Sequence, residues 1–155
     1  MSGKIPNTLI ENINSREPVR VKAKTPLLAV VMAMKEGQRG AAIIEDNAGK
    51  IIGIFTERDL IAELDHSSQD WHDIPVDKIM IKNIKTIKVS HYIHEALAIM
   101  ITCKFRHLPI VDSDNHVLGI VSIRDIIMCV ASLYPQEFLN LPPDPGSVAS
   151  DQYGG

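Results

Sequence analysis

Two stretches of the sequence, GKIIGIFTERDLIA at residues 49–62 and NHVLGIVSIRDIIM at residues 115–128, share one pattern. In each, an apolar–Gly–apolar segment leads into a Thr or Ser and then into an Arg–Asp pair. The offset between them is constant at 66 residues, because Gly53 aligns with Gly119 and Asp59 with Asp125. A fixed internal period of this kind indicates a duplicated structural unit.

The duplication extends upstream without a gap, and apolar positions of one copy align with apolar positions of the other. Short apolar runs separated by Asp, Asn and Gly predict hairpins, and apolar residues at helical spacing predict helices. The predicted strands are Val19–Ala23, Ala41–Glu45 and Ile51–Phe55 in the first copy, and Thr86–Val89, His107–Val111 and Val117–Val121 in the second. The predicted helices begin near Leu27 and Thr56, and near Ile93 and Ser122. The sequence therefore predicts a mixed α+β fold of two tandem β-α-β-β-α repeats with pseudo-two-fold symmetry.

The repeats divide the chain into five parts. We expect a helical lead-in over residues 1–17, the first repeat over 18–65, a polar linker over 66–75 and the second repeat over 76–133. Residues 134–155 are rich in Pro, Gly, Ser and Asp and are predicted to be a mostly mobile tail. Trp71 lies within the linker, and we expect it to anchor this segment onto a core.

The composition is that of a folded protein and narrows the classes of function. The chain has 155 residues, 45% of them hydrophobic, and a formal net charge of −3, which does not favour nucleic-acid binding through phosphate neutralisation. No apolar run has the roughly 20 residues of a membrane helix, and the N-terminus does not resemble a signal peptide. Two unpaired cysteines fit a reducing compartment, so we expect a cytoplasmic protein with no membrane partner.

No catalytic constellation is found in the sequence. The phosphate-binding motif G-x-x-x-x-G-K-[ST], the dinucleotide motif G-x-G-x-x-G and the nucleophile elbow G-x-S-x-G are all absent. Cys103 and Cys129 lie in apolar helical stretches, where packing is favoured over nucleophilic chemistry. His91 and His94 could face the same side of a helix, but a surface or structural role is favoured over zinc. We therefore predict that the protein is not an enzyme and has no metal site.

The paired apolar–Gly–apolar strands that run into T-E-R-D and S-I-R-D resemble tandem CBS domains, also called a Bateman module. The resemblance covers the chain from about Ile10 to Val130 and leaves no room for a separate catalytic domain. It implies a stand-alone pair that binds adenosine-containing ligands in clefts between the repeats. It also implies association into a homodimer.

The two strand-to-helix junctions carry residues suited to such a ligand. A helix N-terminus has unpaired N–H groups and attracts phosphate, and a carboxylate can accept from both hydroxyls of a ribose. The candidates are Thr56, Arg58 and Asp59 in the first repeat, and Ser122, Arg124 and Asp125 in the second. In the alternative interpretation, each hydroxyl and carboxylate simply caps its own helix. The resemblance favours nucleotide contact in at least one copy.

The family pattern implies further contacts. Adenine would rest at the end of the first strand, which here means Lys24, Thr25 and Pro26, or Ser90, His91 and Tyr92. Basic residues before the second strand would face phosphate, and Arg106 and His107 match this pattern. The first repeat has Gly40 there with Arg39 one step earlier, so we expect the two clefts to differ. Alternatively, Arg39 and Arg106 are solvated loop charges, His107 packs at a rim and Tyr92 covers a helix start.

The sequence therefore predicts a regulatory module that senses an adenine nucleotide (AMP, ADP or ATP) and needs no other cofactor. S-adenosylmethionine and NADH fit the same chemistry. Binding would reorient the repeats and change what an unknown protein effector contacts. The main alternative is a structural scaffold whose clefts have lost ligand binding. A nucleotide-converting enzyme and a nucleic-acid-binding protein are less favoured.

Overall fold

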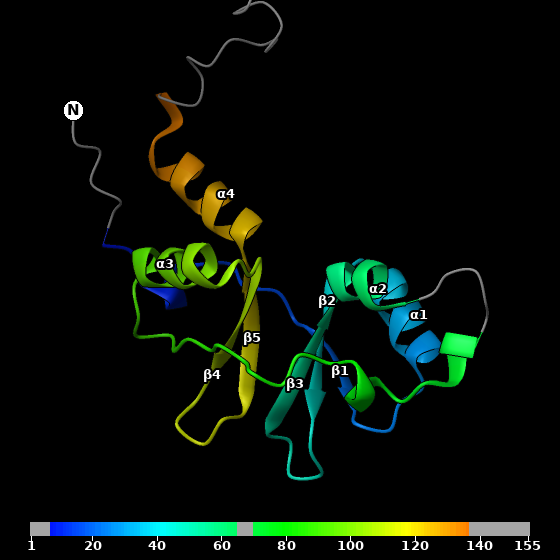
Figure 1. Cartoon of the computed structure of the whole chain (residues 1–155). Helices are drawn as coiled ribbons and strands as arrows, with labels where there is room; N and C mark the ends of the chain where they lie inside the picture. Colours follow the sequence, from blue (N-terminus) through cyan, green and yellow to red (C-terminus); the bar gives the residue numbers. More distant parts are fainter. Residues whose placement is uncertain (1–6, 65–69, 137–155) are drawn as a thin grey trace, which may run out of the picture.

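Each repeat folds into a small sheet with two helices, and the repeats stand side by side with their helices at one end and their hairpin turns at the other (Figure 1). The computed structural model describes residues 7–64 and 70–136. In chain order the elements are η1 (Ile10–Asn12), β1 (Val19–Lys22), α1 (Leu27–Gly37), β2 (Ala41–Glu45), β3 (Ile51–Thr56), α2 (Glu57–Glu63), η2 (Asp70–Asp73), η3 (Val76–Lys78), α3 (Ile93–Cys103), β4 (His107–Val111), β5 (Val117–Ser122) and α4 (Ile123–Leu133), where η denotes a 3₁₀-helix. The predicted mixed α+β fold class is confirmed.

The strands form two sheets. In the first repeat the order is β1-β2-β3, with β1 parallel to β2 and β2 antiparallel to β3. In the second repeat β4 and β5 form an antiparallel pair. Both hairpins that were predicted from turn residues between apolar runs therefore exist, and each contains a register shift near the turn.

The strand predicted at Thr86–Val89 is wrong. Only Ile87 pairs with the sheet, through a single parallel bridge to Ile110. The next amide, that of Lys88, donates instead to Nδ1 of His91 at 3.0 Å, and the Lys88 carbonyl accepts from the His91 amide at 3.1 Å. In the first repeat the Lys22 carbonyl likewise accepts from the Thr25 amide at 3.0 Å, so the bond from the Lys88 amide to the His91 side chain is what distinguishes the second copy.

The helix boundaries follow from local chemistry. Thr56 and Ser122 are the N-cap residues of α2 and α4, and Pro26 directly precedes α1. Both α1 and α3 end at a left-handed residue, Gln38 with φ of 52° and Lys104 with φ of 57°. The left-handed conformation lets the next amides bond the last carbonyls of the helix. The duplicated pattern thus reproduces helix ends as well as helices.

Each hydrophobic core contains residues from a short segment that lies outside its own repeat. We call these two segments, which contain Ile10 and Val76, the exchanged segments. Ile10 and Ile13, which precede the first repeat, are buried among residues of α3, β4, β5 and α4 in the second repeat. Val76, which follows the linker, is buried with α1, β2 and β3 of the first repeat. The exchange is symmetric in its hydrogen bonds, because the Ile10 amide donates to the His91 carbonyl at 2.8 Å and the Val76 amide to the Thr25 carbonyl at 2.9 Å. Each core is therefore completed by a segment that lies before the other repeat in sequence.

The two aligned glycines accommodate these exchanged segments. A Cβ at Gly53 would overlap Sδ of Met80, and one at Gly119 would lie 2.9 Å from Oγ of Ser15. The segment that approaches Gly53 is the one around Met80. Glycine is required because a side chain would occupy the same space.

Part of the predicted linker lies on the first repeat. Trp71, in η2, is half-buried and packs against the core cluster that contains Val76. The predicted anchoring role of Trp71 is therefore confirmed. The rest of the linker, residues 66–69, and most of the predicted mobile tail, residues 137–155, lie outside the described residues.

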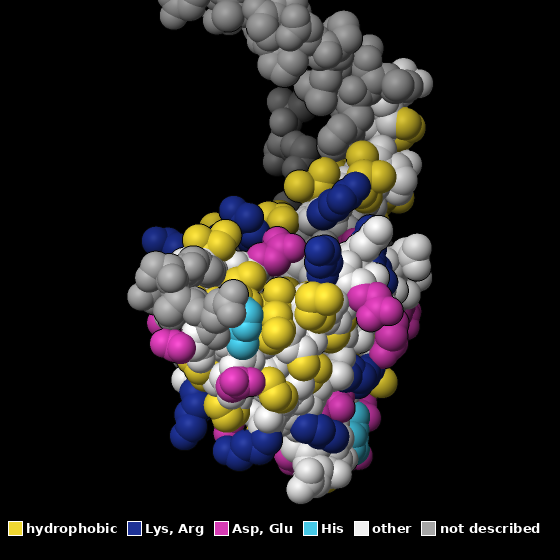
Figure 2. All heavy atoms as spheres, turned by 90° about the vertical axis from the view of Figure 1, so that its right-hand side faces the viewer, with side chains coloured by type: hydrophobic (Ala, Val, Ile, Leu, Met, Phe, Trp, Pro, Cys, Tyr) yellow, Lys and Arg dark blue, Asp and Glu magenta, His cyan; other side chains and the backbone are white. Residues whose placement is uncertain are grey.

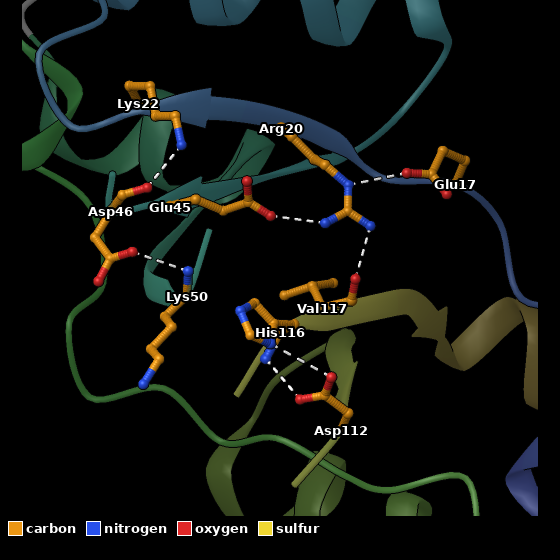
Figure 3. A network of polar contacts seen from close by, with 9 residues as sticks. All are labelled: Glu17, Arg20, Lys22, Glu45, Asp46, Lys50, Asp112, His116 and Val117. Carbon is orange, nitrogen blue, oxygen red and sulfur yellow. Dashed lines mark hydrogen bonds and ion pairs between the residues drawn. The ribbon is translucent and has the colours of Figure 1, made fainter. Parts of the chain in front are cut away.

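The repeats meet through a third apolar cluster and a polar bridge. The cluster is formed by side chains of β2, β3, β4 and β5. Beside it, Arg20 of β1 donates to Glu17 at 2.9 Å, to Glu45 at 2.7 Å and to the Val117 carbonyl at 2.8 Å, as Figure 3 shows. Burial alone would lower the pKa of Arg20, but the hydrogen bonds to Glu17 and Glu45 outweigh it and raise the pKa. The guanidinium therefore ties the first sheet to the second while remaining charged.

The outer faces of the helices keep apolar side chains in solvent. Met32 on α1, Ile61 on α2, Ile101 on α3 and Met128 on α4 are each more than half exposed. On the face seen in Figure 2, hydrophobic side chains lie between charged ones. In the part of the chain that the structure describes, no helix combines the length and apolar character needed to cross a membrane.

Candidate functional site

At both strand-to-helix junctions the carboxylate caps its own helix. Oδ2 of Asp59 accepts from the amide and hydroxyl of Thr56 at 2.8 and 2.7 Å. Oδ2 of Asp125 accepts from the amide and hydroxyl of Ser122 at 2.7 and 2.8 Å. The capping interpretation is thus confirmed for both copies. In each case both bonds end on one oxygen, so Oδ1 lies outside the cap.

A cavity of about 220 Å³ lies beside the first junction, and we call it the Thr56 cavity. One wall is the junction itself, with Thr56, Arg58 and Asp59. The opposite wall comes from the second repeat and the segment that precedes it, so the cavity spans both repeats. Its apolar lining is Ile54, Ile81, Ile84, Phe105 and Pro109, and its cationic lining is Arg58, Lys85, Lys104 and Arg106.

A second cavity of about 320 Å³ lies beside the other junction and is called the Ser122 cavity. Ser122, Arg124 and Asp125 line it from the second repeat, and Gln38 and Arg39 line it from the first. These residues are 66 positions from lining residues of the Thr56 cavity, so pseudo-two-fold symmetry relates the two sites. The predicted junction residues of both repeats therefore line cavities between the repeats.

Four residues line both cavities: Gly40, Glu57, Arg106 and His107. His107 begins β4 and is half-buried, whereas Arg106 is exposed. Burial lowers the pKa of His107, and the nearby carboxylates of Glu57 and Asp125 oppose this only in part. The imidazole is therefore neutral at pH 7. Arg106 and His107, which were predicted to face phosphate, therefore line both cavities.

The residues predicted to contact adenine do not line either cavity. Lys24, Thr25 and Pro26 lie beside the segment around Val76, where the Lys24 ammonium bonds Asp77 at 2.7 Å. The Lys24 hydrogen bond lowers the pKa of Asp77. The aligned residues Ser90, His91 and Tyr92 lie beside the N-terminal segment in the same way. The physical reason is that the segments around Val76 and Ile10 pair with these residues, which therefore contact those segments and not the cavities.

The three predicted arginines beside the junctions have different surroundings. Arg58 donates from Nη1 to the Lys104 carbonyl at 3.0 Å and so connects α2 to the end of α3 across the Thr56 cavity. Arg39 donates from Nε to the Glu17 carbonyl at 3.1 Å. Arg124 is exposed and lines the Ser122 cavity.

Sequence reasoning missed several lining residues. Lys104 is the left-handed cap of α3, and Lys85 lies in the irregular segment before Ile87. Arg16 belongs to the N-terminal segment, lines the Ser122 cavity and has its Nε 3.9 Å from Oδ1 of Asp125. The alignment could have suggested Lys104, which pairs with Gln38. No local pattern identifies Lys85 or Arg16, because only the exchanged segments bring them to the sites.

One cluster elsewhere has metal-ligating side chains. Ligand atoms of Asp112, Asp114 and His116 lie within 4.8 Å of one another in the turn between β4 and β5. Asp112 accepts from the amides of Asp114 and His116 at 2.9 Å each, and the bond from His116 is the main reason its pKa is lowered. These bonds stabilise the turn, and they account for the position of the Asp112 carboxylate without an ion.

Comparisons with known proteins were made for the sequence and the fold. The family model for the CBS domain matches residues 10–66 and 76–132. An uncharacterized 17.7 kDa protein of Acidianus ambivalens is 33% identical over 131 residues, which cover 84% of this chain and 78% of that protein. The CBS domain-containing protein CBSCBSPB5 of Arabidopsis thaliana is 29% identical over 135 residues, which cover 78% of this chain but only 24% of that relative.

Solved structures share the fold. The CBS domain pair of protein MJ0100, in complex with 5'-methylthioadenosine and S-adenosyl-L-methionine, has a TM-score of 0.74 at 23% identity and covers 83% of this chain and 99% of that chain. CBSX2 in complex with AMP has a TM-score of 0.69 at 20% identity and covers 81% and 98%.

Proposed function

Because this chain belongs to the CBS domain family and carries the domain twice, we propose that it is a regulatory module that senses an adenine nucleotide. The ligand would occupy the Thr56 cavity, the Ser122 cavity or both. Support comes from the relatives of the same fold, one of which is in complex with AMP and another with S-adenosyl-L-methionine and 5'-methylthioadenosine.

The charge of the cavity lining carries this proposal. The Thr56 cavity has four cationic side chains and two carboxylates, Glu57 and Asp59. The Ser122 cavity likewise has four arginines and two carboxylates. A positive excess inside a partly enclosed site attracts phosphate and repels a sulfonium cation. The lining therefore favours AMP, ADP or ATP over S-adenosylmethionine, while the phosphates of NADH remain compatible.

The geometry suggests one orientation for the ligand in the Thr56 cavity. Oδ1 of Asp59 lies outside the cap and is the acceptor proposed for the ribose hydroxyls. The apolar residues Ile81, Ile84 and Pro109 form the surface proposed for the base. Phosphates would then face Arg58 and Arg106. Adenine contact is thus proposed for residues other than those that the family pattern implied.

Binding would act through the relative position of the repeats. Arg58 connects α2 to the Lys104 carbonyl across the Thr56 cavity, and a phosphate would compete for the same guanidinium. A ligand that binds one arrangement better shifts the population toward it. We propose that a protein effector responds to this shift, that the exposed apolar helix faces support a homodimer, and that the module acts in the cytoplasm without catalysis.

Thermal unfolding with separate additions of adenosine, AMP, ADP, ATP, S-adenosylmethionine and NADH tests the proposal. A nucleotide at about 100 times its Kd adds about 2.7 kcal/mol of stability, which corresponds to a rise in Tm of roughly 5–11 °C for a domain of this size. The chain also offers an internal reporter. Cys103 lines the Thr56 cavity, whereas Cys129 lines neither cavity. A bound nucleotide should slow alkylation of Cys103 and leave Cys129 unchanged; no shift in Tm and no protection by any of the six would refute the proposal.

A second function is a scaffold without a ligand. The observation in its favour is that the aligned carboxylates of the two repeats, Asp59 and Asp125, already serve as helix caps. The same thermal measurements separate the two functions, because a scaffold is not stabilised by any nucleotide. Retention of a nucleotide through purification, identified by mass spectrometry after denaturation, would exclude the scaffold directly.

A further inference from the structure

Gly40 and Arg106 are one of the aligned pairs at which the linings of the two cavities differ. The Gly40 carbonyl accepts from the amide of Glu57 at 3.0 Å, and the Arg106 carbonyl accepts from the amide of Ile123 at 2.9 Å. Gly40 and Arg106 are therefore in the same backbone position, each bonded to the first residue of the following helix. One of them has a guanidinium and the other has no side chain.

The side chains of His107 from the second repeat and Glu57 from the first lie beside Gly40. A Cβ at Gly40 would lie 3.4 Å from both Cε1 and Nε2 of His107 and 3.5 Å from Cδ of Glu57. The imidazole thus packs directly against Gly40. As a result, Arg106 and His107 line the Ser122 cavity of their own repeat and also the Thr56 cavity.

Sharing has an electrostatic consequence when both cavities are occupied. Arg106 is one of four cations in each cavity, and it is the only cation among the lining residues common to both. Its guanidinium can form a strong bidentate pair with one phosphate group at a time. A second anionic tail would meet a cation that is already paired, and it would also be repelled by the first tail.

We propose that the two cavities bind phosphate-bearing adenine nucleotides with negative cooperativity, because they share Arg106 across Gly40. The proposal rests on the proposed function. The first nucleotide engages Arg106, and the second binds with the remaining cations of its own cavity. The module then responds to nucleotide over two separated concentration ranges, although its cavities have the same formal charge.

Calorimetric titration of the full chain with ADP and with adenosine tests this inference. Adenosine has no phosphate, so the ratio of its two stepwise constants reports the difference between the cavities that does not involve phosphate. With ADP this ratio should be larger by at least about tenfold, which corresponds to about 1.4 kcal/mol. Equal ratios for ADP and adenosine would overturn the proposal. Absence of binding by either compound would instead overturn the proposed function, and the two failures are therefore distinguishable.

Two variants that add the same charge localise the effect. Gly40→Arg supplies the first repeat with its own guanidinium at the position equivalent to Arg106, and it should reduce the ADP ratio toward the adenosine ratio. Ala48→Arg adds a cation at the exposed turn after β2. Gly40 lies at the other end of this strand, so Ala48→Arg should leave the ADP ratio as in the wild type. Equal reduction by both variants would overturn the assignment to Arg106. If Gly40→Arg does not fold, Arg106→Gln removes the shared guanidinium instead and should likewise bring the ADP ratio toward the adenosine ratio; an unchanged ADP ratio in this variant would overturn the proposal.

Discussion

Replacing Asp59 by Asn and by Ala separates the role of its carboxylate in the cap from its proposed role in ligand binding. Oδ2 accepts two hydrogen bonds from Thr56, whereas Oδ1 is the atom proposed to contact ribose. Alanine removes both functions. Asparagine keeps one acceptor oxygen, which can receive the Thr56 amide, but it loses the negative charge.

The expected magnitudes follow from these contacts. Loss of an N-terminal cap costs about 1–2 kcal/mol, so Asp59→Ala should lower Tm by roughly 2–8 °C. Asp59→Asn should cost about 0.3–1 kcal/mol, which is the interaction of one charge with a helix terminus. A hydrogen bond to a charged group contributes about 1.5–3 kcal/mol, so both variants should weaken AMP binding by at least about tenfold.

Calorimetry with AMP and thermal unfolding without ligand provide the two readouts. Glu95 is a matched control, since its carboxylate accepts from the amide of Tyr92 at 2.7 Å and caps α3 but lines neither cavity. Glu95→Ala should lower Tm in the same range and leave AMP affinity unchanged. The reasoning is refuted if Asp59→Asn binds AMP as tightly as the wild type, because the carboxylate would then serve the cap alone.

Three further predictions concern the fold. Ile10→Ala should destabilise the protein by about 2–5 kcal/mol and reduce hydrogen-exchange protection first in β4 and β5. Val76→Ala should reduce protection first in β2 and β3, and the opposite pattern would contradict the assignment of these residues to the two cores. Gly53→Ala should lower the free energy of unfolding by about 1–3 kcal/mol, because the added methyl group would contact Met80. In denaturant titrations, adding Met80→Ala should recover part of this free energy, and additive losses in the double variant would show that the contact is not responsible. Because the pKa of His107 is lowered in the folded state, the unfolded chain binds the proton more readily, and the free energy of unfolding should fall as pH drops below about 6.5. In denaturant titrations between pH 5 and 8, His107→Gln should make this dependence on pH less steep, and an unchanged dependence would exclude His107 as its source.

The sequence by itself determined the elements whose signals are local. The hairpins follow from turns such as Asp46 to Lys50, where one carboxylate oxygen accepts from the amides of Ala48 and Lys50, and the same turn recurs after Asp112. Helix starts at Thr56 and Ser122 follow from cap bonds that span three residues. Such contacts depend on neighbours in sequence, so a pattern of residue types is sufficient to predict them.

Tertiary structure alone decided which segments complete each core and which residues line each cavity. Both copies offer similar apolar faces, so nothing in the local pattern assigns Ile10 to the second repeat or Val76 to the first. That assignment pairs the residues expected to contact adenine with the segments around Ile10 and Val76, and it brings Ile81 to the Thr56 cavity. The same packing places Arg106 at both cavities, whereas the aligned residue of the first repeat is Gly40. Contacts between distant segments depend on how the whole chain packs, and a short sequence window does not contain that information.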